Sequence, residues 1–96
     1  PQPQALNPIV EAALSSVLAF AESSGVELVY EAQDFQVEAD ADRIVQVLIN
    51  LLSNAVKFSP EGSEVKVEAE QIDNEIELSV IDRGRGIPPE SLSGVF

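Results

Sequence analysis

The residues that could do chemistry lie in two segments of the sequence. The first segment, residues 50–58, reads NLLSNAVKF, and the second, residues 82–88, reads DRGRGIP. Amide oxygens can bind a hard cation without adding negative charge, and a lysine ammonium can bind phosphate as a point charge. An aspartate at a strand end can accept a hydrogen bond from an amine, and paired glycines let the backbone approach a ligand closely.

The first segment belongs to an expected helix over residues 43–58, capped by Asp40 or Asp42. Successive helical residues are rotated by about 100°, which gathers the polar residues on one narrow stripe, namely Arg43, Gln46, Asn50, Asn54 and Lys57. The stripe has no carboxylate in a chain that has 17 acidic residues. It is either an ordinary solvated face or the wall of a polar pocket that must not be anionic.

Single residues in these segments also have structural explanations. Lys57 lies where the helix dipole favours a cation, and Phe58 is of a type most often found in a core. The pattern Asp82-x-Gly84-x-Gly86 is weak in isolation, because an aspartate before glycines can simply stabilise a turn. The residues alone therefore leave both a structural and a ligand-binding interpretation open.

The remaining elements must position these two segments. Residues 1–6 resemble the end of a linker, and a helix is expected from Asn7 as its cap to Gly25, with one apolar stripe formed by Ile9, Ala13, Val17 and Phe20. Alternating residues predict strands at 26–30, 35–39, 64–70 and 75–80, the last two joined as a hairpin through residues 71–74. Pro89 and Glu90 are expected to open a short helical segment.

These elements predict an α/β (α+β) fold in two layers. Strands with one polar and one apolar face form a sheet that is covered on one side. We therefore expect a two-layer sandwich in which a mixed, largely antiparallel sheet is covered on one face by helices. We expect this fold to be incomplete at its C-terminus.

The composition excludes several classes of site and partner. The chain has 96 residues with neither cysteine nor histidine, which excludes disulfides, thiolate metal sites and imidazole chemistry within it. A net charge of −12 disfavours binding to nucleic acid and to anionic lipid, because proteins bind both of these anionic surfaces through lysine and arginine. No apolar run is long enough for a membrane span. We expect a cytoplasmic domain without a nucleic-acid partner, and leave open whether its parent protein is membrane-bound.

Taken together, the two segments resemble the ATP-binding catalytic domain of sensor histidine kinases. NLLSNAVKF resembles the N box, VIDRGRGIP (residues 80–88) contains a match to the first glycine box (82–88), and the hairpin between them has the family's spacing. The resemblance covers residues 7–96, and Phe96 resembles the first residue of the F box. It implies the sandwich fold shared with type II topoisomerase and mismatch-repair ATPases.

The resemblance implies a role for each site residue, with ATP and Mg²⁺ as cofactors. Asn54 would bind Mg²⁺, Lys57 would contact phosphate and Phe58 would border the nucleotide. Asn50 occupies the position where topoisomerase relatives have a catalytic glutamate, so an amide there fits a kinase rather than a hydrolase. The remaining cofactor-binding residues would surround the adenine, with the aspartate on its amino group: Asp82, Gly84, Gly86 and Ile87.

The resemblance also implies partners outside these residues. Because the chain has no histidine, the phosphoryl acceptor is expected on a histidine-bearing dimerisation domain of the same protein, with a response regulator receiver domain downstream and a homodimeric full-length protein. The lid, the second glycine box and the last strands of the family's domain are not among these 96 residues, and the chain alone is expected to be inactive. A catalytically silent interaction module and an anti-sigma-factor serine kinase are the alternatives, although the N box favours the sensor-kinase form.

Overall fold

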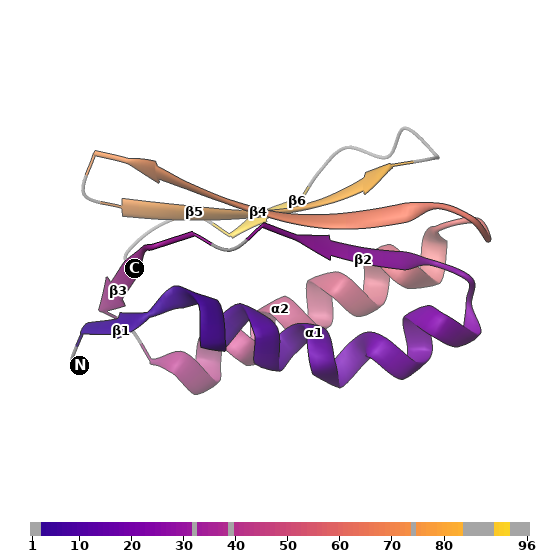
Figure 1. Cartoon of the computed structure of the whole chain (residues 1–96), viewed down its shortest axis with the longest axis horizontal. Helices are drawn as coiled ribbons and strands as arrows, with labels where there is room; N and C mark the ends of the chain where they lie inside the picture. Colours follow the sequence, from indigo (N-terminus) through magenta and orange to yellow (C-terminus); the bar gives the residue numbers. More distant parts are fainter. Residues whose placement is uncertain (1–2, 32, 39, 74, 84–89, 93–96) are drawn as a thin grey trace.

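The computed structural model describes residues 3–31, 33–38, 40–73, 75–83 and 90–92. Four strands form a mixed sheet in the order β2-β4-β5-β6, in which only the β2–β4 pair is parallel, among the strands described: β2 (Glu27–Tyr30), β4 (Glu64–Ile72), β5 (Glu75–Arg83) and β6 (Glu90–Leu92). Helices α1 (Leu6–Ser23) and α2 (Ala41–Phe58) lie together on one side of this sheet (Figure 1). The predicted two-layer sandwich is confirmed.

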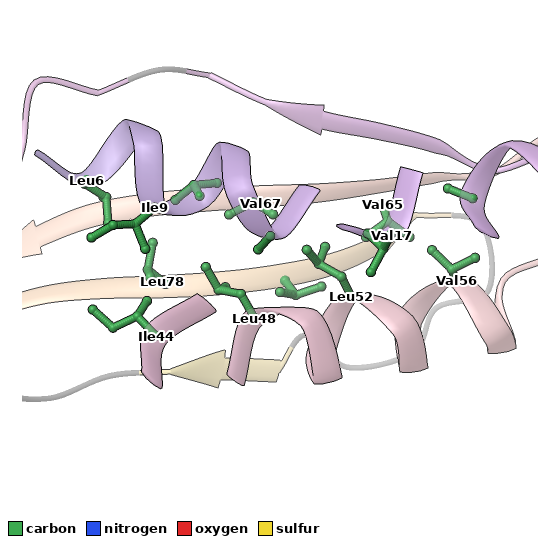
Figure 2. Close-up of a cluster of buried hydrophobic side chains, with 14 of the residues drawn as sticks. Leu6, Ile9, Val17, Ile44, Leu48, Leu52, Val56, Val65, Val67 and Leu78 are labelled. Carbon is green, nitrogen blue, oxygen red and sulfur yellow. The ribbon is translucent and has the colours of Figure 1, made fainter. Parts of the chain in front are cut away.

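The core lies between the two helices and the sheet. Figure 2 shows side chains of α1, α2, β4 and β5 pointing into this one space, including Leu6, Leu48, Leu52, Val65 and Leu78. Each of these five side chains is completely buried. The predicted alternation of the β4–β5 hairpin is also confirmed, because its apolar residues alternate with exposed or half-buried polar ones.

The start of α1 differs from the sequence prediction. Residues Pro3–Ala5, expected at a linker end, form strand β1, which pairs antiparallel with β3 (Gln36–Glu38). The predicted cap at Asn7 is wrong, because the helix begins at Leu6 and the preceding residue makes no side-chain cap. The Asn7 Oδ1 atom instead accepts hydrogen bonds from the Tyr30 hydroxyl and the Gln33 N–H.

The end of α1 follows the sequence prediction. Gly25 has a φ of +70°, and its N–H donates to the Glu22 carbonyl while the Val26 N–H donates to the Ala21 carbonyl. This pair of bonds is the Schellman ending, which requires the left-handed conformation that glycine tolerates. The Gly25 carbonyl also accepts a 2.7 Å bond from the Gly62 N–H, so the turns after α1 and α2 are joined.

Two further expectations are corrected by the structure. Phe20 was expected on the buried stripe of α1, but it is 42% exposed and Ala21 is buried instead, because the buried face drifts by one residue along the helix. The helical segment expected after Pro89 is wrong for residues 90–92, which form β6 and pair with residues 78–80 of β5. Pairing with an existing strand satisfies backbone groups that a segment this short could not satisfy as a helix.

The two helices described, α1 and α2, both lie in the layer that covers one side of the sheet. Neither of them combines the length and the apolar character that crossing a bilayer would require.

Candidate nucleotide-binding site

Helix α2 presents one of the two predicted segments. Its start is fixed by Asp40, whose carboxylate accepts from the N–H groups of Asp42 and Arg43, as predicted for a helix cap. Its buried residues recur every four positions at Ile44, Leu48, Leu52 and Val56. This stripe faces the core, so the opposite side of the helix is turned outward.

The uncharged polar stripe of α2 lies on that outward side. All five of its residues are exposed: Arg43, Gln46, Asn50, Asn54 and Lys57. At about 100° per residue, the middle of this stripe is roughly opposite the buried stripe. The two amides and the ammonium at its C-terminal end therefore form one accessible row with no carboxylate in it.

Lys57 is the last residue of the polar stripe, and Phe58 follows it as the last residue of α2. The Lys57 Nζ atom lies 5.5 Å from the centroid of the Phe58 ring. Phe58 is 51% exposed, so the expectation of a core residue does not hold for it. An exposed aromatic ring beside an ammonium is a surface that can accept a flat ring and an anionic group together.

Asp82 is the second key residue, and the structure buries it. It lies on β5 two residues after Val80, on the same face as the core residues Ile76 and Leu78, and only 8% of it is exposed. Both carboxylate oxygens are buried without a hydrogen-bond partner among the described residues. A buried carboxylate is costly unless it is paired, so this group is well suited to receive a donor from a ligand.

Ser63 is also buried, but unlike Asp82 it has a hydrogen-bond partner within the described residues. These two are the buried polar residues of the part of the chain described, and they lie at the same end of the sheet. The Ser63 hydroxyl donates a 2.6 Å bond to the Pro60 carbonyl and so stabilises the turn after α2. A role for this serine was not predicted, although the proline and glycine of the turn could have indicated one.

The topology brings the two predicted segments to one end of the molecule. Asp82 pairs in register with Val65 at the start of β4, and β4 follows α2 after the short turn at residues 59–63. The carboxylate and the C-terminal half of the polar stripe are therefore at the same end, from different elements. Gly84, Gly86 and Ile87 lie outside the described residues.

The comparisons with known proteins show which family the chain belongs to. The family model for histidine kinase-, DNA gyrase B- and HSP90-like ATPases matches residues 39–96, which include α2, the hairpin and the glycine segment. The chain belongs to this ATPase family. Within the family, the chain is 40% identical over 85 residues to the histidine protein kinase DivJ of Caulobacter vibrioides, across 86% of this chain and 14% of DivJ.

Solved structures in this ATPase family share the fold. The catalytic domain of histidine kinase ThkA superposes with a TM-score of 0.79 at 28% identity, covering 91% of this chain and 61% of that domain. ThkA in complex with the response regulator protein TrrA matches with a TM-score of 0.77 at 29% identity, covering 91% of this chain and 27% of the kinase chain. The chain thus spans less than two thirds of each relative, and about a seventh of DivJ.

Proposed function

We propose that this chain is the ATP-binding catalytic region of a two-component sensor histidine kinase, and that it transfers the γ-phosphoryl group of Mg-ATP to a histidine on a separate dimerisation domain. The observation that carries the proposal is the buried Asp82 carboxylate, which has no hydrogen-bond partner among the described residues, at the same end as an exposed helix face without carboxylates. Membership of the ATPase family, with histidine kinases among its relatives, supports nucleotide as the ligand.

The roles follow from the chemistry of each group. The Asp82 carboxylate accepts from the exocyclic amine of adenine, which satisfies an otherwise costly buried acceptor. The Asn54 amide oxygen is a neutral ligand for Mg²⁺, and Lys57 binds phosphate oxygens. Phe58 lies at the border of the nucleotide. The remaining proposed contacts with the base come from the glycine segment: Gly84, Gly86 and Ile87.

The chain's contribution to the reaction is orientation and charge. When bound, Mg²⁺ supplies positive charge next to the phosphate oxygens and so lowers the cost of the developing negative charge. Lys57 adds a second cation, and the absence of carboxylates from the α2 stripe avoids repulsion of the phosphates. Asn50 has no basic group that could activate water, so the site favours transfer to a bound acceptor over hydrolysis.

The acceptor and the partners lie outside this chain. The 96 residues include no histidine, so the phosphorylated imidazole belongs to a separate domain. The solved complex of ThkA with TrrA supports a response regulator as the next acceptor. We propose that the full-length protein is a homodimer that brings this ATP-binding region to a dimerisation domain.

A titration with ADP and with GDP, each with and without Mg²⁺, tests the assignment. Asn54→Ala should weaken Mg²⁺-dependent ADP binding by about tenfold or more, because a ligand to the cation is lost. Asp82→Asn should remove the preference for ADP over GDP, since an amide group can donate as well as accept. Gln46→Ala, a change to another exposed amide of the same stripe, is the matched control and should bind as the unchanged protein does.

The outcome that would overturn the proposal is specific. If both variants remain folded, as judged by circular dichroism, and bind ADP with unchanged affinity and selectivity, these residues do not form the nucleotide site.

A further inference from the structure

Strand β4 has an open edge that no strand among the described residues occupies. β4 has nine residues, all of which pair with β5, but β2 pairs only with residues 64–67. Residues 68–72 are therefore paired with β5 on one side, and on the other side no strand of the described part of the chain pairs with them. Figure 1 shows why: after β2 the chain leaves the sheet and runs to β3, beside β1, while the hairpin continues past the end of β2.

A hollow lies along this edge. It measures about 230 Å³ and is lined by Glu31 and Gln33, from the chain that leaves β2, and by residues 66–70 of β4. The lining has three carboxylates, those of Glu31, Glu68 and Glu70, and one ammonium, that of Lys66. Lys66 is already bound to Glu68, with its Nζ atom 3.4 Å from a carboxylate oxygen. Glu31 and Glu70 are exposed and form no ion pair with the described residues.

We propose that this edge binds an extended peptide segment of a partner protein with lysine or arginine at alternating positions. The segment would add a strand beside residues 68–72, and the backbone groups of β4 would supply the hydrogen bonds. Side chains of a strand alternate between its two faces. Glu68 and Glu70 are two positions apart and therefore lie on the same face of β4, so cations at alternating positions of the peptide would all lie on that face. Cross-strand pairs of opposite charge contribute to the stability of such an addition.

The charge of the edge decides between possible occupants. A second copy of this chain would place Glu68 and Glu70 against the same two residues, and like charges opposite each other are unfavourable. Nucleic acid is disfavoured by the same carboxylates and by the net charge of −12. A cationic extended segment is the occupant that these charges complement. The inference does not depend on nucleotide binding, because the edge lies away from Asp82 on the other half of the hairpin.

A fluorescent capped peptide of alternating lysine and valine, as long as the open edge, is the probe. Fluorescence anisotropy should show saturable binding to the protein, and amide hydrogen exchange should slow at residues 68–72. Two control peptides separate strand addition from general attraction: one has the same residues with its lysines in one block, and one is N-methylated at alternate residues. Both should bind about tenfold more weakly, because they lose the charge pattern or the backbone donors.

Paired protein variants locate the site. The double change Glu68→Lys and Glu70→Lys should weaken binding by about tenfold, because it replaces attraction by repulsion at two positions. The double change Glu22→Lys and Glu61→Lys has the same effect on net charge but lies at exposed positions near the ends of α1 and α2, at the other end of β4 from residues 68–72. It should weaken binding by no more than about threefold, through general electrostatics that added salt screens.

Three outcomes would overturn the inference. Equal binding of the N-methylated peptide would show attraction without strand pairing, and equal loss in the two protein variants would show a diffuse acidic surface. The absence of binding to the alternating peptide would mean that the carboxylates only protect the edge from aggregation, which charged side chains on strand edges often do. ADP should leave peptide affinity unchanged, which keeps this test separate from that of the nucleotide site.

Discussion

The two helices have the same length, 18 residues, and pack side by side on the same sheet, yet their ends are determined differently. Helix α2 has a side-chain cap at Asp40, an acidic residue in its first turn and Lys57 in its last turn. Helix α1 has none of these features. Its start is held instead by contacts with distant residues, such as the bond from the Leu6 N–H to the Phe35 carbonyl. The ends of α2 are therefore encoded locally, and the start of α1 depends on the rest of the fold.

The exposed faces of the helices also differ. α1 leaves Leu18 and Phe20 almost half exposed, whereas α2 exposes a row that includes Asn50 and Asn54. Asparagine is a poor helix former, and in α1 the one asparagine, Asn7, is used to hold other residues in place. In α2 the two asparagines have no such structural use in the described part of the chain. This difference supports the proposal that α2 contributes residues to the nucleotide-binding site.

The largest expected effect concerns the buried face that α2 contributes to the core. Leu48 is completely buried, so Leu48→Ala should lower the free energy of unfolding by about 2–5 kcal/mol through lost burial and the cavity left behind. Leu18→Ala, the same change at an exposed position of α1, should alter it by no more than about 0.5 kcal/mol. Urea unfolding followed by circular dichroism measures both. Equal losses would mean that the packing described for the two helices is not the packing in solution.

A smaller effect separates the asparagines of the two helices. Asn7→Ala removes the acceptor for the Tyr30 hydroxyl and the Gln33 N–H and should cost about 1–2 kcal/mol, since these donors are only partly buried. Asn54→Ala should leave stability unchanged or raise it by about 0.5 kcal/mol, because alanine is the better helix former at an exposed position. Both values come from urea unfolding without nucleotide. A large loss for Asn54→Ala would assign it a structural role and weaken its assignment as a ligand to Mg²⁺.

The sequence predicted the features whose causes are local. The cap at Asp40, the end of α1 at Gly25 and the alternation of the hairpin each depend on residues within a few positions of one another. These features place α2 and β5, and with them most of the candidate site. The sequence also predicted that Asp82 lies at a strand end, although not that both its oxygens would be buried without a partner among the described residues.

The features that the sequence did not predict depend on distant partners. Strand β1 exists because it pairs with residues 36–38, and β6 exists because it pairs with residues 78–80. Asn7 has the chemistry of a helix cap, but the hydroxyl of Tyr30 and the N–H of Gln33 engage its side chain instead. Local patterns hold no information on such choices, because the partner lies ten or more residues away in each case and more than twenty away for Asn7.

The smallest expected effect is a pH dependence at the contact between α1 and β2. Burial raises the pKa of the Tyr30 hydroxyl, the bond with the Gln33 backbone lowers it, and the charge of Glu11 raises it, with a net shift upward. A raised pKa means that the folded state holds the proton more tightly than the unfolded state. This contribution is therefore complete below the unfolded pKa of about 10 and is lost as the pH rises through the folded pKa.

Titration of the phenolate absorbance checks this pH dependence directly, because Tyr30 is the one tyrosine of the sequence and tryptophan is absent. The hydroxyl should ionise at a higher pH in the folded chain than in the same chain unfolded in urea. Glu11→Gln should move the folded titration slightly toward lower pH, since it removes a charge that opposes ionisation, whereas Glu22→Gln near the other end of α1 should not. Ionisation at the same pH in both states would mean that the Tyr30 hydroxyl is not buried at the contact between α1 and β2 in solution.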